Sequence, residues 1–281
     1  MTKLLFPLLV LAAAATPFSG ALAAQVTLEA TRDNTIYRES LGGSNAAADN
    51  FSAGKAGSAT AVRRGLVAFD LTALPSPIQV DRVALELTFQ GLTNMENDPR
   101  VLAIHRLLAQ WGEGTSNAGP GGASGTGNGA AATTNDATWR YRLFDTQAWA
   151  AYDPAVAGSG GGDFVSLPSA SATVGIDPGV LVTWETIRSG PPSGMVADVE
   201  QWLADPSSNA GWLLKVVDES PVRTVRRFYS HEAATAAFHP RLVIDYTVVP
   251  EPRALPMFVL GGIGAWIAMR GRLGGRTRSP A

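Results

Sequence analysis

Residues 82–90 read Arg-Val-Ala-Leu-Glu-Leu-Thr-Phe-Gln, a stretch in which large apolar side chains occupy every second position. Successive side chains of a β-strand point to opposite faces, so the apolar residues at 83, 85, 87 and 89 share one face. This alternation predicts a strand with one buried face. Residues 242–246 repeat the pattern near the end of the chain.

Other short segments rich in β-branched and aromatic residues lie between clusters of Gly, Pro, Asn and Asp, which form turns. They predict further strands at 26–30, 35–38, 64–71, 100–108, 211–217 and 224–229. Many short strands with turn signals between them and almost no helix indicate an all-β protein. We therefore expect an antiparallel β-sandwich of jelly-roll type.

One segment has helical spacing. In residues 193–204 the apolar side chains Met195, Val199, Trp202 and Leu203 fall on one helical face. Ser193 stands at the capping position, and Asp205-Pro206 ends the segment. The pattern predicts one short helix that covers an open end of the sandwich.

The middle of the chain differs in composition from both flanks. Residues 112–132 are mostly Gly, Ala, Ser, Thr and Asn, and 158–162 are nearly all glycine. Such stretches bury too little apolar surface to fold alone, so they are expected to be loops. Because no linker separates two complete strand sets, residues 25–249 are predicted to form one domain with a long Gly-rich loop at 112–132.

The N-terminus resembles a secretory signal peptide. Lys3 is followed by an apolar run at 4–15 and then by the small residues that signal peptidase accepts. Residues 1–24 are therefore expected to be removed on export by signal peptidase, with cleavage after Ala23 or Ala24.

The C-terminus, residues 250–281, carries Pro250-Glu251-Pro252, an apolar stretch at 255–269, and an acid-free arginine cluster. As a helix this stretch is about 22 Å long, which is shorter than the hydrocarbon core of a bilayer at about 30 Å. Tilting of the helix or thinning of the bilayer accommodates the difference. The arginines place this end at the cytoplasmic side. The order resembles the PEP-CTERM sorting signal, which implies processing by an exosortase, a transmembrane helix at 255–269 and a final location in the cell envelope or outside the cell. The alternative is a plain tail anchor, which leaves Pro-Glu-Pro unexplained.

Charge and cysteine content exclude several classes of protein. Of 22 basic and 24 acidic residues, six basic and one acidic residue lie outside 24–249, which leaves 16 and 23 and a net charge of −7. An acidic body with scattered basic residues argues against a nucleic-acid partner. The absence of cysteine removes disulfides and thiolate ligands or nucleophiles.

A series of short motifs, in order, spans nearly the whole body. The series is 33–36 (Asp-Asn-Thr-Ile), 63–71 (Arg-Arg-Gly-Leu-Val-Ala-Phe-Asp-Leu), 84–87 (Ala-Leu-Glu-Leu), 105–108 (His-Arg-Leu-Leu), 111–114 (Trp-Gly-Glu-Gly), 136–139 (Asp-Ala-Thr-Trp), 209–214 (Asn-Ala-Gly-Trp-Leu-Leu), 227–232 (Arg-Phe-Tyr-Ser-His-Glu) and 240–246 (Pro-Arg-Leu-Val-Ile-Asp-Tyr). It resembles the DNRLRE domain, a secreted β-sandwich module similar to carbohydrate-binding module family 96. The resemblance implies association with extracellular polysaccharide and no chemistry.

The chain departs from that family at one corner. The family usually shows Ser-Arg-Glu where this chain has Ser230-His231-Glu232. A neutral histidine replaces neither the charge nor the two-pronged geometry of an arginine that pairs with a carboxylate. A ligand role shared with the family is therefore in question at this corner.

Aromatic residues around the Gly-rich loop are the ligand candidates. The apolar face of a sugar ring stacks on an exposed aromatic ring, while acids and amides take its hydroxyl groups. The alternative for Trp111 and Trp139 is that they fill the core beneath the loop, as Trp202 and Trp212 are expected to do elsewhere. The candidate binding residues are Trp111, Glu113, Asp136, Trp139, Tyr141 and Trp149.

Loop acids and amides also suggest calcium, which binds hard oxygen ligands and is the one cofactor that these residues indicate. The alternative is that these residues are solvated turn formers. The weak calcium candidates are Asn94, Glu96, Asp98, Glu113 and Asp136. The three histidines are isolated in sequence, and His105 on a strand pattern is expected to be packed or hydrogen-bonded.

Three functions remain open. The first is a non-catalytic exported module that associates with exopolysaccharide or biofilm matrix, and the second is a polysaccharide-active enzyme that uses an acid pair such as Glu113 and Asp136. The third is a purely structural matrix or adhesion protein. The sequence has no nucleophile elbow, phosphate loop or His-Glu-x-x-His motif, which favours the non-catalytic functions.

Overall fold

The structure is a computed structural model of the 281-residue chain. It describes residues 22–91, 97–119 and 129–249. Within these ranges the protein is predominantly β, every strand pair is antiparallel, and the only α-helix is α1 (Gly194–Ala204). Ala21–Val248 forms one compact unit. The predicted all-β class and the single short helix are confirmed.

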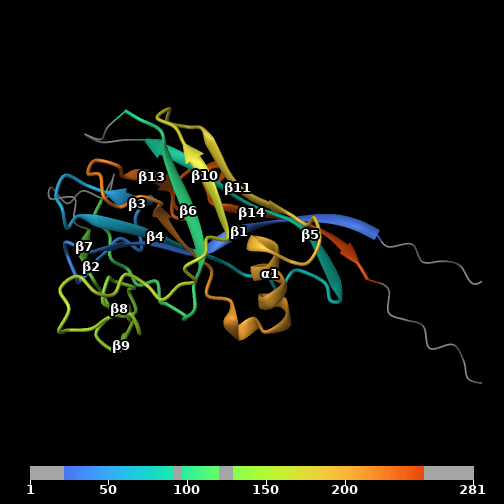
Figure 1. Cartoon of the computed structure of the whole chain (residues 1–281), viewed down its shortest axis with the longest axis horizontal. Coiled ribbons are helices and arrows are strands. Elements are labelled where there is room, and N and C mark those ends of the chain that lie inside the picture. The colour runs from blue at the N-terminus through green and yellow to red at the C-terminus, as the bar shows by residue number, and fades with distance from the viewer. Residues whose placement is uncertain (1–21, 92–96, 120–128, 250–281) are drawn as a thin grey trace, which may run out of the picture. The chain divides into compact units, whose positions relative to one another are not determined.

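Ten strands form one continuous hydrogen-bonded sheet (Figure 1). In spatial order its strands are β1 (Leu22–Tyr37), β14 (Arg241–Val248), β5 (Ile78–Gly91), β13 (Arg226–Tyr229), β3 (Asn50–Lys55), β4 (Val62–Phe69), β12 (Trp212–Val216), β6 (Arg100–Arg106) and β10 (Ala170–Val174), with β11 (Leu181–Ile187) on β5. Two small sheets pair β2 (Gly43–Ser44) with β7 (Ala130–Ala131), and β8 (Tyr141–Leu143) with β9 (Gln147–Ala148).

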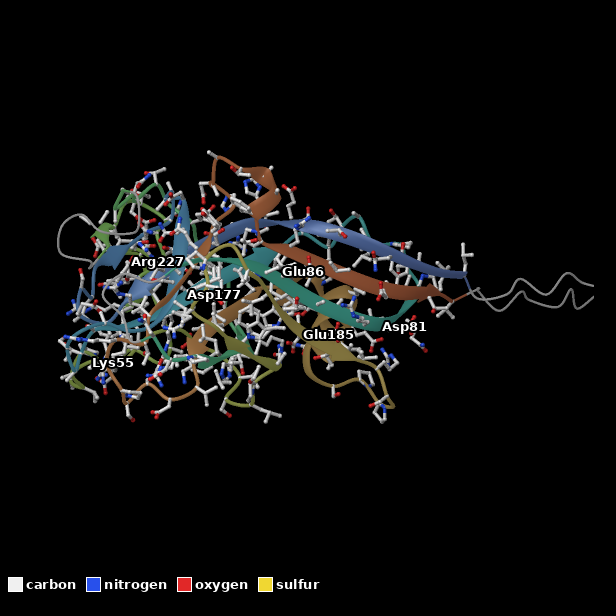
Figure 2. The ribbon with its side chains drawn as sticks, turned by 90° about the horizontal axis from the view of Figure 1, so that it is seen from above. Lys55, Asp81, Glu86, Asp177, Glu185 and Arg227 are labelled. Carbon is white, nitrogen blue, oxygen red and sulfur yellow. The ribbon has the colours of Figure 1, made fainter. Side chains whose placement is uncertain are left out.

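The two longest strands change partners along their length. Residues 22–29 of β1 pair with β14, and residues 30–37 pair with β4 after a register shift at Ala30 and Arg32. Strand β5 pairs with β14 and β11 over most of its length and with β13 at its end. In Figure 2 the strands β14, β5 and β11 run side by side, and the labelled Glu86 and Glu185 mark the last two.

The strand pairs β5–β14 and β4–β12 both face the main hydrophobic core. Strands β5 and β14 contribute Leu85 and Ile244, and β4 and β12 contribute Phe69 and Trp212. Helix α1 adds Met195, Val196, Val199 and Trp202, and the rings of Trp202 and Trp212 lie 4.6 Å apart. The helix therefore covers this core as its periodicity predicts, although the side chain of Ser193 makes no capping hydrogen bond.

A second core lies on the opposite face of β4 and β12. Because side chains alternate along a strand, Val67 and Phe69 enter the main core, and Leu66 and Ala68 enter the second. The segment after β6, called the covering segment below, lies over this second face. It contributes the buried tryptophans Trp111, Trp139 and Trp149. Trp111 and Trp139 stand on either side of the predicted loop at 112–132, so the chain enters and leaves that loop from this packed layer.

The predicted sorting elements fall mostly outside the described residues. These include the apolar run of the signal peptide, Pro250-Glu251-Pro252 and the span at 255–269. Among the residues that the structure describes, no helix is long and apolar enough to cross a membrane. The predicted cleavage residues Ala23 and Ala24 begin β1, opposite Thr247 and Tyr246. Cleavage after Ala24 would leave Gln25 as the first paired residue, with its amide donating to Asp245 at 2.6 Å.

Candidate functional site

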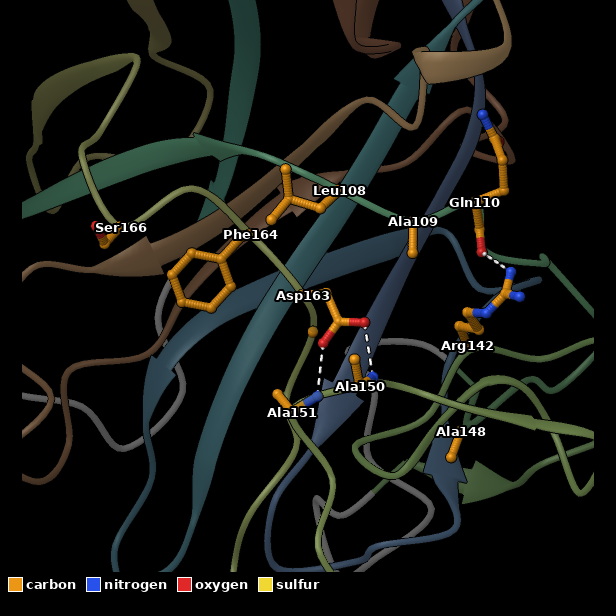
Figure 3. Close-up of a pocket in the computed structure, with 11 residues that line it drawn as sticks. Leu108, Ala109, Gln110, Arg142, Ala148, Ala150, Ala151, Asp163, Phe164 and Ser166 are labelled. Atoms are coloured by element: carbon orange, nitrogen blue, oxygen red, sulfur yellow. Dashed lines mark hydrogen bonds between the residues drawn. The ribbon is translucent and has the colours of Figure 1, made fainter.

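An open groove lies between residues 108–110, which follow β6, and residues 142–166 of the same covering segment, and Figure 3 shows its walls. Its volume is about 910 Å³. Leu108, Ala109, Ala148, Ala150 and Phe164 give it a largely apolar lining, and Gln110, Arg142 and Asp163 add polar groups. Phe164 is half-buried and packs edge-on against His105, with ring centroids 5.1 Å apart.

Backbone hydrogen bonds hold the polar groups of the groove. The Asp163 carboxylate accepts hydrogen bonds from the backbone N–H groups of Ala150 at 2.7 Å and Ala151 at 2.8 Å. Arg142 donates from Nη1 to the backbone carbonyl of Gln110 at 3.0 Å. These contacts, drawn in Figure 3, fix the two sides of the groove.

The predicted aromatic rim is wrong in its main members. Trp111, Trp139 and Trp149 are only 1%, 2% and 1% exposed. Each indole N–H donates to a backbone carbonyl inside the protein, of Ala210, Gly158 and Thr138 in turn. These rings fill the second core and present no face to a sugar, as the alternative for Trp111 and Trp139 anticipated.

Tyr141 is the one aromatic candidate that is not fully buried. It lies in β8, half-buried, with its ring 5.9 Å from that of Phe144 and 6.5 Å from that of Tyr152. These three half-buried rings form a small aromatic surface on the covering segment. His105, by contrast, is buried and bonded through Nδ1 to the Val165 carbonyl at 2.9 Å, as expected for a packed histidine.

The calcium candidates that the structure describes, Asp98, Glu113 and Asp136, do not form a metal-ligand cluster with one another. Asp136 is fully buried, and its carboxylate accepts hydrogen bonds from Gly114 and Thr133, so it stabilises the loop. Asp98 lies 3.8 Å from Arg100 in an exposed ion pair. Asn94 and Glu96 lie outside the described residues.

Glu113 instead meets two residues that the sequence reading did not select as ligands. Asp33 in β1, Glu113 after β6, and His231 after β13 each offer one ligand atom, and the three atoms lie within 4.8 Å of one another. Asp33 is fully buried, and the side chains of Glu113 and His231 are 15% and 24% exposed. The three segments are remote in sequence but converge at one corner of the fold.

The contacts in this cluster are short. His231 Nδ1 lies 3.0 Å from Asp33 Oδ2, and His231 Nε2 lies 3.6 Å from Glu113 Oε2 and 3.0 Å from Glu232 Oε1. The backbone N–H of His231 donates to Asp33 Oδ2 at 2.8 Å. The backbone N–H of Asp33 donates to Glu113 Oε1 at 2.6 Å, which fixes the second carboxylate beside the first.

Burial and neighbouring charges shift the pKa values of Asp33, Glu113 and His231. Burial raises the pKa of Asp33 to about 6, although hydrogen bonding to His231 opposes the rise. Burial also raises the pKa of Glu113 to about 8, and the charges of Asp33 and Glu232 add to the rise. Burial lowers the pKa of His231, but its hydrogen bonds to Asp33 and Glu232 outweigh that effect and raise it to about 10. Strongly shifted groups in contact are typical of functional sites.

The sequence contained one signal of this site. The sequence analysis singled out the corner Ser230-His231-Glu232, and His231 lies in the cluster. No local motif links Asp33, Glu113 and His231, because their proximity depends on the pairing of β1 with β4 and on the return of the chain after β13. A scan against protein-family models and a search of curated proteins give no match to the chain.

Proposed function

We propose that this chain is an exported, non-catalytic module that is sorted to the cell envelope and associates with extracellular polysaccharide or biofilm matrix. The observation that carries the proposal is the open groove with Phe164 in its lining and Gln110, Arg142 and Asp163 at its edges. Small-molecule sites typically combine apolar walls with a few fixed polar groups.

The chemistry of the groove suits a sugar. The apolar face of a pyranose can pack on Phe164, while the Gln110 amide and the Arg142 guanidinium offer donors to its hydroxyl or carboxylate groups. The body has a net charge of −7 between residues 24 and 249. A neutral glycan, or an acidic one that Arg142 binds, therefore fits better than a densely charged polymer.

The fold is compatible with a β-sandwich module of jelly-roll type spanning 25–249, as the resemblance to the DNRLRE domain implies. Several of the matching motifs fall in strands that build the main core, including 84–87 in β5 and 240–246 in and before β14. Because these motifs lie in the core, they support a scaffold shared with the DNRLRE domain, but they give no information about a shared ligand.

The enzyme alternative is less well supported. Its acid pair requires two carboxylates that reach a substrate, but Asp136 is fully buried and both of its oxygens accept hydrogen bonds from the loop. Asp163 in the groove is likewise held by two backbone N–H groups. These engagements favour a binding role over general acid–base catalysis.

Polysaccharide retention tests the binding proposal. The full chain should be retarded in affinity electrophoresis by a neutral or weakly acidic polysaccharide, and Phe164→Ala should reduce the retardation by about tenfold or less. Phe238→Ala removes another half-buried ring, stacked on Tyr229 with centroids 4.7 Å apart, and is the matched control. Equal retardation of both variants and the wild type would reject the groove. A chain that no polysaccharide retards would favour the purely structural role.

Mass spectrometry tests the sorting proposal. In a host with an exosortase, the protein should be shortened near Pro250-Glu251-Pro252, and in a host without one it should remain membrane-bound with the tail intact. The order of that motif, the apolar stretch 255–269 and the arginines motivates the expectation. An intact tail of identical mass in both hosts would refute it.

A further inference from the structure

We propose that Asp33, Glu113 and His231 bind one divalent transition-metal ion of the zinc type, in a site independent of the groove. The three side chains come from β1, from the segment after β6 and from the turn after β13. Two carboxylates and one imidazole are a ligand set that zinc accepts, with room for water at a fourth position.

The spacing of the donors suits a small ion. Four ligands about 2.0 to 2.1 Å from a tetrahedral zinc ion lie about 3.3 to 3.4 Å from each other. In the cluster, His231 Nδ1 lies 3.0 Å from Asp33 Oδ2, close to that separation, and Glu113 Oε2 lies 3.6 Å from the other ring nitrogen. All three ligand atoms fall within 4.8 Å of one another, so small side-chain adjustments bring them around one ion.

One oxygen of the cluster lacks a partner. Asp33 Oδ1 is buried and accepts no hydrogen bond within the described residues, while Oδ2 accepts both contacts from His231. A buried carboxylate oxygen without a donor is costly, so such an atom requires an explanation. A cation at the cluster supplies the missing partner.

The charge balance points the same way. Three carboxylates, from Asp33, Glu113 and Glu232, surround the single imidazole of His231. The nearby Arg32 donates to the Trp111 carbonyl and lies 4.8 Å from the Trp111 ring, although its charge also acts on Glu113. An ion of charge +2 bound between these side chains offsets negative charge that they hold in common.

The surroundings of His231 also match a metal-bound histidine. Such a histidine usually donates its second ring N–H to a carboxylate, which fixes the ring and its tautomer. Glu232 Oε1 lies 3.0 Å from Nε2, in position to accept that N–H while Nδ1 faces Asp33. The imidazole also distinguishes the site from a calcium site, which takes oxygen ligands almost alone.

Zinc titration of the full chain tests the proposal. After dialysis against EDTA and removal of the chelator, isothermal titration calorimetry with Zn²⁺ should show one ion per chain. Glu113→Gln should weaken binding by about a hundredfold or more, and Glu232→Gln by about 10- to 100-fold. His231→Arg supplies a permanent cation to the same carboxylates without a metal-binding nitrogen, so the variant should fold and bind no zinc.

The control is His239→Gln, which removes a histidine that contacts Glu29 and the Ala233 carbonyl, outside the cluster. Its zinc affinity should equal that of the wild type. Replacing Zn²⁺ by Co²⁺ should give visible absorption bands that His231→Arg lacks. Absence of zinc binding by the wild type, equal affinity in His231→Arg, or calcium binding that exceeds zinc binding would each overturn the proposal.

Discussion

Two buried acids of this protein have opposite surroundings. Asp198 in α1 accepts hydrogen bonds from Ser169 and from the Trp212 indole, and Arg106 pairs with it at 3.2 Å. Asp33 in β1 faces two further carboxylates across one histidine and keeps one oxygen without a donor among the described residues. Burial raises the pKa of both acids, but only Asp198 has an arginine to oppose the rise.

Two buried tryptophans differ in what their indole N–H groups bond to. The Trp212 indole N–H donates to the Asp198 carboxylate. The indole N–H of Trp111, which stands two residues before Glu113 in the sequence, donates to the Ala210 carbonyl instead. A buried acid whose charge is paired and whose oxygens are bonded contributes to structure. A buried acid that faces other acids indicates a place for a cation.

The largest expected effect comes from removing the ring that holds the covering segment. Trp111→Ala should lower the free energy of unfolding by about 3 to 5 kcal/mol, because a fully buried indole is replaced by a cavity. Urea denaturation measures the loss. A variant of unchanged stability that selectively loses polysaccharide retention would show that Trp111 is an exposed ligand residue, and the second core would then be wrong.

An intermediate effect is expected at the paired acid. Asp198→Asn keeps the shape but removes the charge that faces Arg106 and the strong acceptor for Trp212 and Ser169. The unfolding free energy should fall by about 1 to 3 kcal/mol. The same denaturation series measures this variant, and no loss of stability would contradict the structural role of Asp198.

The matching substitution at Asp33 should have the smallest effect. In EDTA, Asp33→Asn should change the unfolding free energy by less than about 1 kcal/mol, because it removes a carboxylate whose burial and proximity to Glu232 disfavour its charge, and keeps an acceptor for the His231 N–H. Added Zn²⁺ should raise the melting temperature of the wild type and leave that of this variant unchanged. A large loss of stability in EDTA would make Asp33 a structural acid like Asp198.

Much of the fold followed from periodicity in the sequence. The alternation at 82–90 lies within β5, and the helix expected at 193–204 is α1 at Gly194–Ala204. The segments predicted at 26–30 and 35–38 are one strand, β1, because a register shift lets it continue from one partner to another. Strand β3 had no signal, because apart from Phe51 the residues of Asn50–Lys55 are polar or small, yet the whole strand is buried.

The candidate site was less predictable for a physical reason. Aromatic and acidic residue types suggested ligand contacts at Trp111 and Asp136, but local sequence does not reveal which face of a loop becomes a second core. Glu113 was selected as a loop acid, whereas Asp33 and His231 were not selected. Their convergence depends on long-range strand pairing, which residue spacing does not encode.

Anomalous scattering tests the central claim most directly. Crystals of the full chain grown with Zn²⁺ and measured on both sides of the zinc absorption edge should show one strong peak bounded by Asp33, Glu113 and His231. The same data from His231→Arg crystals should show no peak at this place. No peak in the wild type, or a peak only at exposed acids such as Asp98, would contradict the metal site. The proposed difference in role between Asp33 and Asp198 would then be lost.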